Sequence, residues 1–315
     1  MKVLVLGGNG FIGSHVVDAL LHAGHKVRVF DRSEDRYRGR LKGVEYMQGS
    51  FQDNFLIAEA LTDIDVVFHG ISTTVPATSN LDPAGDVYSN LIATLKLLKS
   101  MLDKGMQRIV YLSSGGTVYG RPTMDPIPES HPLNPVCSYG IVKVAIENYL
   151  YMFQELQGLK PIVLRASNPY GERQGHQGVQ GVIGTFLYKA HSNERIEIWG
   201  DGSVVRDFIY VGDLGQMCLK AIENEVCGVF NVGSGIGHSI NEVLAYVQAV
   251  SNRPLQIDYK PARGFDVARV VLDISRATST FNWIPQLSLQ DGISKTWAWL
   301  SESSKHVEDK NGRTS

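Results

Sequence analysis

A glycine run directly follows the first apolar stretch of the chain. Residues 2–6 are apolar beyond Lys2, residues 7–13 read GGNGFIG, and residues 12–21 continue as an amphipathic segment. Glycines at such a strand-to-helix turn permit a tight turn, close approach of the backbone to a pyrophosphate, and close packing of the helix on the strand. The helix N-terminus adds partial positive charge. The spacing is G-x-x-G-x-x-G rather than the standard G-x-G-x-x-G, but its position predicts a dinucleotide site.

The first half of the chain alternates between short apolar runs and helical periodicity. Helices are predicted over residues 90–102 and 139–153, and further strands near residues 26–30, 44–47, 66–68, 108–112 and 161–165. A repeating β-α order predicts an α/β fold of the Rossmann type, in which a doubly wound parallel sheet binds the dinucleotide at its carboxyl edge.

Asp31 ends the second predicted strand, about 20 residues beyond the glycine run. A carboxylate there accepts hydrogen bonds from the adenosine ribose and repels a 2′-phosphate, which favours NAD over NADP. Arg32, the next residue, weakens that preference.

The pattern loosens beyond Arg165. Residues 172–181 are polar and glycine-rich, and they precede a predicted helix at 183–190, a strand at 196–199 and a turn at 200–202. We expect residues 1–165 to form the NAD-binding domain, to which segments within about 207–235 return. Residues 166–300 are expected to form a smaller mixed α/β substrate lobe. The polar tail, 301–315, lacks apolar periodicity and is predicted to be disordered.

The composition indicates neither a nucleic-acid partner nor membrane insertion. The chain has 315 residues and a formal net charge of −2, with 43% hydrophobic and 20% charged residues. Such a chain has no net field to attract nucleic acid or an anionic membrane. The opening apolar run is too short for a signal peptide, and no stretch approaches the roughly 18 apolar residues of a spanning helix. We therefore expect a cytoplasmic protein.

Cysteines and histidines indicate no metal site. The three cysteines are too few and too scattered for a zinc site or a disulfide framework. The spacing of metal ligands is also absent among His15, His69 and His176.

Tyr139 and Lys143 stand four residues apart in a predicted helix. Residues at that spacing share one helix face. The lysine ammonium is therefore expected near the phenol, where it favours phenolate and lowers the tyrosine pKa from about 10 toward the working pH. A phenolate of this kind is a general base for a sugar or alcohol hydroxyl. A solvated helix face can carry the same pair, but its combination with the glycine turn points to nicotinamide chemistry.

The order of these segments resembles that of the extended short-chain dehydrogenase/reductases, and among them the nucleotide-sugar epimerases and dehydratases. The matching segments cover nearly the whole chain: 7–13, Asp31, Asp53, 66–69, Asn90, 113–120, 139–143, 165–171, 200–213 and 263–273. The resemblance implies a homodimer and bound NAD. The cofactor site that it implies consists of Gly7, Gly10, Phe11, Ile12, Gly13, Asp31, Arg32, Asp53, Asn54, His69, Gly70, Asn90, Ser113, Tyr139 and Lys143.

The likeness is greatest to UDP-galactose 4-epimerases and their UDP-N-acetylhexosamine relatives. It implies that NAD oxidises the sugar C4 hydroxyl, that the 4-keto sugar rotates, and that hydride returns to the opposite face. Tyr139 is then the acid/base. In these enzymes a serine or threonine that bonds the C4 oxygen stands where this chain has Gly115. Either Ser114 or Thr117 is a candidate to replace it, or neither does; a serine restored at position 115 is expected to raise activity.

Position 117 also distinguishes between reactions. The 4,6-dehydratases of the family carry an aspartate and a glutamate in this segment, whereas this chain has Gly116 and Thr117. Without those carboxylates, elimination lacks its acid and base, so epimerisation is favoured. The alternatives are a nucleotide-sugar decarboxylase or reductase, and a non-catalytic NAD-binding regulatory protein.

The resemblance also implies a UDP-sugar site. Arginine suits diphosphate because its planar fork holds two oxygens. Val270 occupies the position that controls room beside the sugar C2 substituent, and a small residue there admits an N-acetyl group. We expect both the glucose/galactose and the GlcNAc/GalNAc pairs to be accepted. The implied substrate residues are Asn168, Trp199, Arg206, Arg263, Asp266 and Val270.

Overall fold

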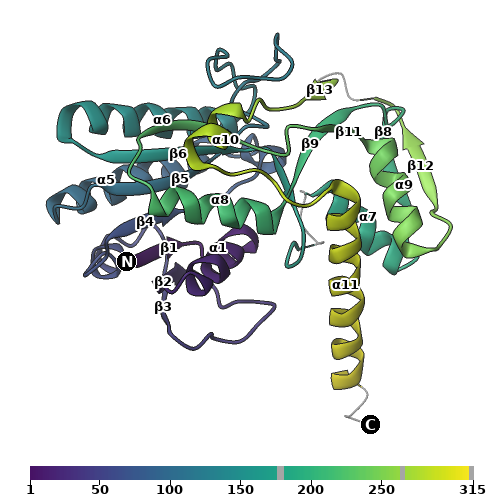
Figure 1. Ribbon diagram of the computed structural model, residues 1–315, viewed down its shortest axis with the longest axis horizontal. Helices are drawn as coiled ribbons and strands as arrows, with labels where there is room; N and C mark the ends of the chain where they lie inside the picture. The colour runs from purple at the N-terminus through teal and green to yellow at the C-terminus, as the bar shows by residue number, and fades with distance from the viewer. Residues whose placement is uncertain (176–180, 263–266, 312–315) are drawn as a thin grey trace.

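The computed structural model describes residues 1–175, 181–262 and 267–311. Its centre is a seven-stranded sheet in the order β10-β6-β5-β4-β1-β2-β3, and every pair of neighbouring strands is parallel. Parallel strands covered on both faces read as continuous apolar runs, as here. The predicted Rossmann-type fold is confirmed (Figure 1). The strands are β1 (Lys2–Leu6), β2 (Lys26–Asp31), β3 (Val44–Gln48), β4 (Val66–His69), β5 (Arg108–Ser114), β6 (Lys160–Ala166) and β10 (Gly228–Val232).

Helices cover both faces of this sheet because successive strand residues point to opposite sides. Val3 and Val5 of β1 pack with one group of helices, and Leu4 and Leu6 pack with the other. The first group is α1 (Phe11–His22), α8 (Val211–Glu223) and α10 (Ser275–Phe281). The second group is α2 (Asn54–Ala60), α5 (Ala93–Asp103) and α6 (Ser138–Gln157).

A smaller mixed α/β lobe follows β6 and gathers at the other end of the molecule (Figure 1). β9 (Val205–Tyr210) is its central strand: it pairs in parallel with β7 (Asn168–Tyr170) and β13 (Arg269–Val270), and antiparallel with β11 (Gly237–Ser239). A second, two-stranded sheet joins β8 (Ile196–Trp199) to β12 (Ile257–Lys260). The lobe's helices are α7 (Val182–His191), α9 (Ile240–Ser251) and α11 (Leu289–Asn311).

The segment between β4 and β5 is more elaborate than the predicted single helix. It contains α3 (Pro76–Ser79), α4 (Pro83–Asp86), the π-helix η1 (Val87–Ile92) and then α5. Asp82 caps α4 by accepting from Gly85 N, and Pro83 occupies the first helical position. π-helical turns are rare in proteins, but those that occur often lie at functional sites.

The end of the chain differs from its predicted disorder. α11 continues to Asn311, so most of the polar tail is helical. Extending a helix costs little once a packed segment has nucleated it, and Leu289 and Ile293 of α11 are buried in the core of the smaller lobe. Among the described residues, no helix has both the length and the apolarity needed to cross a membrane. The boundaries of the two lobes stay a prediction, although β10 does lie in the main sheet.

Candidate active site

Two adjoining cavities lie at the carboxyl edge of the main sheet. The glycine-turn cavity, of about 500 Å³, lies against Gly7, Gly10 and Asp31. The lobe cavity, of about 590 Å³, lies between the sheet and the smaller lobe. Phe11, Gly70 and Ser72 line both of them, so the two spaces form a continuous site.

The glycine turn has the geometry expected for close backbone approach. Gly7 has a φ of +85°, in the region that favours glycine. A Cβ added to Gly13 would lie 2.0 Å from the Gly7 carbonyl oxygen. Gly10 caps α1 without a side chain, and a helix N-terminus with accessible N–H groups suits a pyrophosphate. The residues therefore fit the dinucleotide predicted from the sequence.

Asp31 lines the glycine-turn cavity and is the last residue of β2. Its carboxylate accepts from Asn9 N at 3.1 Å and from Ser33 N at 3.2 Å. Arg32 and Arg36 line the same cavity. The carboxylate is thus held toward the space where the adenosine ribose is predicted to bind.

Asp53 and Asn54 are not among the residues that line this cavity. The Asp53 carboxylate caps α2 by accepting from Phe55 N at 3.0 Å and Leu56 N at 3.1 Å. The lining contains Ser50 and Phe51 instead, together with Gly49 and Gln52. A helix-capping aspartate and a ligand-binding one look alike in a sequence that ends a strand and starts a helix.

Two of the predicted cofactor residues, His69 and Asn90, lie behind the lining rather than in it. His69 is buried, bonds Thr94 Oγ1 through Nε2 at 2.9 Å, and has its pKa lowered to about 3 by burial and by Lys143. Asn90 accepts from Thr73 N at 2.9 Å. Ser113, which also lines the lobe cavity, donates to Glu147 Oε1 at 2.5 Å.

The first two turns of α6 bring Tyr139 and Lys143 to the lobe cavity. The Lys143 Nζ lies 5.5 Å from the centre of the Tyr139 ring and donates to Leu112 O at 2.9 Å. Burial lowers the pKa of Lys143 to about 8, and the Glu147 and Asp86 carboxylates oppose that shift.

The predicted lowering of the Tyr139 pKa toward neutrality is not found. Burial raises the pKa of Tyr139 to about 12 rather than lowering it toward neutrality. Hydrogen bonds with the Ser114 and Ser72 side chains act in the lowering direction but do not offset burial. The pairing of the two residues is as expected; the cost of desolvating a phenolate is not visible in their spacing.

The two candidate hydroxyls differ in their surroundings. Ser114 bonds Tyr139. Thr117 Oγ1 is buried and has no hydrogen-bond partner among the described residues, although Thr117 lines the lobe cavity. Because buried hydroxyls are nearly always paired, an unpaired one beside a cavity is a candidate to bond a ligand.

Gly115 faces away from the lobe cavity. A Cβ there would lie 2.5 Å from Leu272 Cδ1 and 3.0 Å from Arg165 O. A Cβ on Gly116 meets open space, with Asn168 Oδ1 at 3.9 Å. The side chain of a serine at position 115 would therefore enter the core rather than the lobe cavity, which argues against the expectation that this serine raises activity.

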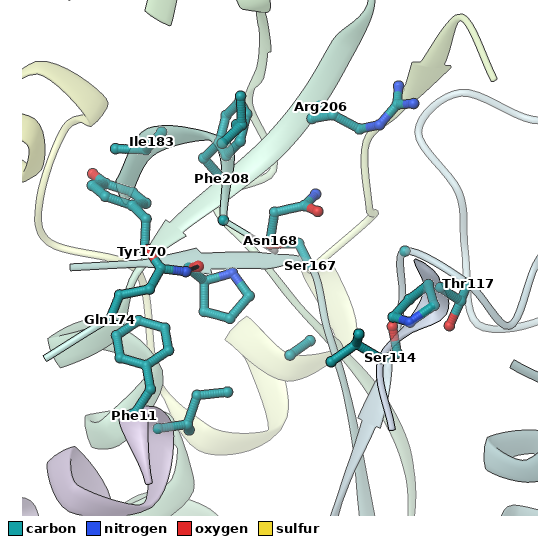
Figure 2. A pocket seen from close by; sticks show the side chains of 18 of the residues that line it. Phe11, Ser114, Thr117, Ser167, Asn168, Tyr170, Gln174, Ile183, Arg206 and Phe208 are labelled. Atoms are coloured by element: carbon teal, nitrogen blue, oxygen red, sulfur yellow. Dashed lines mark hydrogen bonds between the residues drawn. The ribbon is translucent and has the colours of Figure 1, made fainter. Parts of the chain in front are cut away.

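Two lining residues were missed by sequence reasoning. Ser167 Oγ and Gln174 Oε1 are buried without a partner in the described part of the chain, and both residues line the lobe cavity. Figure 2 shows Ser114 and Thr117 on one side, Phe11, Tyr170 and Gln174 on the other, and Ser167 and Asn168 between them. Ser167 and Gln174 each follow the end of a strand, but neither has a spacing from other polar residues that would mark it in the sequence.

The predicted substrate residues are only partly brought together. Asn168, Trp199 and Arg206 line the lobe cavity, and Asn168 Nδ2 donates to Asp207 O at 2.8 Å. Arg206 also donates to Val267 O at 2.7 Å. Arg263 and Asp266 lie outside the described residues.

Val270 is not among the lining residues. It is buried in a small cluster with Val118, Tyr119, Ile127 and Leu272, in register with Arg206 across β13 and β9. Its proposed role in sugar choice stays a prediction. Over the ranges that the structure covers, no group of three or more His, Cys, Asp or Glu side chains is placed to hold a metal ion.

Comparison with known proteins places the chain in a family. Residues 3–233 match the model of the NAD dependent epimerase/dehydratase family. A "Putative UDP-glucose 4-epimerase" of Methanocaldococcus jannaschii is 35% identical over 96% of this chain and 99% of its own length.

Solved structures of the same family have a similar fold. A Thermotoga maritima UDP-glucose 4-epimerase with UDP-glucose has a TM-score of 0.92 and 34% identity over 96% of this chain and all of its own (100%). A Thermus thermophilus UDP-glucose 4-epimerase with NAD has a TM-score of 0.89 and 32% identity, and the match covers 96% of this chain and 99% of that one. A Methanobrevibacter ruminantium UDP-N-acetylglucosamine 4-epimerase has a TM-score of 0.90 and 28% identity, and the match covers 96% of this chain and 98% of that one. The chain belongs to the NAD-dependent epimerase/dehydratase family of extended short-chain dehydrogenase/reductases.

Proposed function

We propose that this protein is a UDP-sugar 4-epimerase. The observation that carries the proposal is the cluster of Tyr139, Lys143, Ser114 and the unpaired Thr117 hydroxyl in a cavity continuous with the glycine-turn cavity. Its relatives include enzymes named for UDP-glucose and for UDP-N-acetylglucosamine. NAD is the cofactor of the family, and when bound it supplies a hydride acceptor that is regenerated within each turnover.

The chain's own residues then have separate tasks. Tyr139 Oη takes the proton of the C4 hydroxyl as the hydroxyl is oxidised, and returns it when the 4-keto sugar is reduced. The Lys143 ammonium stabilises the transient phenolate. Thr117 donates a hydrogen bond to the C4 oxygen, and Ser114 orients the phenol. Arg206 binds the diphosphate, with Asn168 beside it.

Epimerisation is favoured over elimination and decarboxylation by the lining. Gly116 and Thr117 offer no carboxylate next to Tyr139. Among the described residues that line the lobe cavity, the one with a carboxylate is Glu197, which lies on β8 and forms an ion pair with Lys260 at 3.7 Å. A lobe cavity of about 590 Å³ also provides space for a 4-keto sugar to turn its other face.

The proposed substrates are both sugar pairs: UDP-glucose with UDP-galactose, and UDP-GlcNAc with UDP-GalNAc. The test is incubation of the purified enzyme with each of the four, followed by chromatographic or NMR separation of the 4-epimers. Interconversion of at least one pair supports the proposal. If reduction or decarboxylation products form instead, or no sugar is turned over, the proposal is wrong.

We also propose that the protein forms a homodimer through α6. Ile141, Tyr149 and Leu156 are 54%, 37% and 72% exposed, and their spacing places them along one side of the helix. Tyr88, on the neighbouring η1, is 57% exposed. Light scattering of the wild type and of Ile141→Asp tests this: the variant is expected to be monomeric, and a monomeric wild type overturns the proposal.

A further inference from the structure

A buried carboxylate joins three elements around the lobe cavity. Asp86, the last residue of α4, is 1% exposed, which is unusual for an aspartate. It accepts from Thr74 Oγ1 at 2.7 Å, from Asn90 Nδ2 at 2.8 Å and from Ser138 Oγ at 2.7 Å. Burying a carboxylate is costly, and these three hydrogen bonds offset that cost.

Each donor belongs to a different part of the site. Thr74 lies in the cavity wall, defined here as residues 72–76, four of which line the lobe cavity. Ser138 is the first residue of α6 and directly precedes Tyr139. Asn90 lies on the π-helix η1 and also accepts from Thr73 N. The carboxylate therefore links the cavity wall to the first turn of the helix that carries the catalytic tyrosine.

A second side chain reinforces the same link. Asn80 Oδ1 accepts from Ser138 N at 2.9 Å, so the start of α6 is bonded twice to the segment that continues the wall. Within the wall, the Ser72 side chain bonds the Tyr139 side chain. A shift of the wall would thus change the surroundings of the phenol directly, and small displacements of reacting groups lower rates steeply.

We propose that Asp86 is a positioning residue for the reaction of the proposed function: it fixes the cavity wall against Tyr139 without touching the substrate. The inference rests on the proposed function for its kinetic consequence, but not for its structural one. Asp86 is absent from the lining of both described cavities.

Its charge has a second, supporting effect. Lys143 faces Glu147 from its own helix, Asp86 from α4, His69 from β4 and the Tyr111 ring from β5. Among these, the two carboxylates favour the charged lysine and raise its pKa. Removing the charge of Asp86 therefore lowers the pH at which Lys143 loses its proton.

Three variants separate the bonds from the charge. Asp86→Ala removes all three hydrogen bonds. Asp86→Asn keeps the shape and an acceptor for Thr74 and Asn90, and its amide can donate to the Ser138 hydroxyl, so only the charge is lost. Ser138→Ala removes one bond without altering the carboxylate. The matched control is Asp82→Ala, because Asp82 caps the other end of α4 but does not reach the cavity wall.

Two measurements on the intact, NAD-bound protein test the proposal. Hydrogen–deuterium exchange of the peptide covering residues 72–80 is expected to rise at least fivefold in Asp86→Ala and measurably in Ser138→Ala, but not in Asp82→Ala. With the UDP-sugar that the wild type epimerises, kcat is expected to fall about tenfold in Asp86→Ala while KM changes less than threefold. In Asp86→Asn the alkaline limb of the kcat profile is expected to move to lower pH.

The outcomes are separable. If the wild type turns over no UDP-sugar, the proposed function fails, and the exchange experiment still decides the role of Asp86. Unchanged exchange in residues 72–80 overturns the positioning role, as does equal loss of kcat in Asp82→Ala and Asp86→Ala. If Asp86→Ala does not fold, Ser138→Ala carries the same test with Ser138→Thr, which keeps the hydroxyl, as the rescuing variant.

Discussion

The Lys143 ammonium lies 5.5 Å from the centre of the Tyr139 ring, but the pKa of that phenol is about 12. The two side chains are thus paired while burial still opposes ionisation of both. Burial disfavours the phenolate and the ammonium alike, since each is a charge removed from water. The raised pKa keeps the Tyr139 phenol protonated near neutral pH, so a role for Tyr139 as a base requires a group that stabilises its phenolate.

Tyr139→Phe removes the proposed acid/base group. Turnover of UDP-sugar is expected to fall by two or more orders of magnitude, as for loss of a general acid/base, while bound NAD is retained. Steady-state kinetics and the ultraviolet spectrum of released cofactor measure the two quantities. Near-normal turnover in a variant that keeps its NAD would remove Tyr139 from the mechanism.

Lys143→Met should separate stability from function. The folded-state pKa of Lys143 is about 8, below its ordinary value of 10.5, so burying the charged lysine destabilises the fold fully below pH 8 and progressively less as pH rises toward 10.5. Without cofactor, the methionine variant is therefore expected to be more stable than the wild type at pH 7, and this gain in stability is expected to be smaller at pH 10. The variant is also expected to lose turnover and to retain less NAD. Urea denaturation at both pH values measures this. Equal effects at both pH values would show that burial of the charge is not the cause.

Thr117→Val and Ser114→Ala should have different effects. Valine has the shape of threonine without the unpaired hydroxyl, so Thr117→Val is expected to leave the melting temperature unchanged or raise it. Its kcat is expected to fall at least tenfold if Thr117 bonds the C4 oxygen. Ser114→Ala loses a bond to Tyr139 and should shift the pH dependence of kcat. Equal and trivial effects on kcat would mean that Tyr139 works without either hydroxyl.

Gly115→Ser and Gly116→Ser form a matched pair. The Cβ at position 115 would overlap Leu272 in the core, so this variant is expected to unfold at lower temperature and to lose activity. The Cβ at position 116 enters open space near Asn168 and should leave stability nearly unchanged while raising KM. Thermal denaturation and kinetics of both proteins provide the comparison. A more active Gly115→Ser would contradict the packing argument.

Val270→Tyr tests sugar choice. The cluster around Val270 is filled by Val118, Tyr119, Ile127 and Leu272, so a tyrosine ring cannot remain inside it and is expected to extend beside Arg206 toward the sugar. N-acetylated UDP-sugars should then be excluded and the plain hexoses spared. Losing a few apolar contacts costs only about 1–3 kcal/mol, so the small valine alone does not reject UDP-glucose. Unchanged rates for UDP-GlcNAc in the variant would remove Val270 from sugar selection.

The sequence predicted the sheet well because strand and helix periodicities alternate along 1–165. It also paired Tyr139 with Lys143, since both are fixed to one helix face by their spacing. It could not predict the high pKa of Tyr139, which depends on how much chain covers the ring. Nor could it find Ser167 or Gln174, because the direction of a polar side chain in a loop depends on contacts that form only in the fold. Asp53 was assigned to the cofactor because a helix-capping aspartate and a ligand-binding one look alike in a sequence; in the structure its carboxylate caps α2.

The edge position of β10 beside β6 affects how the protein is made. Synthesis proceeds from the N-terminus, so β6 is complete long before residues 228–232 emerge from the ribosome. During that interval the nascent sheet ends in an uncovered strand whose interior, including Ile162, Val163 and Leu164, is buried in the finished protein. Uncovered apolar edges pair with other chains. We therefore expect a chain cut after β6 to aggregate rather than to form a self-sufficient cofactor domain.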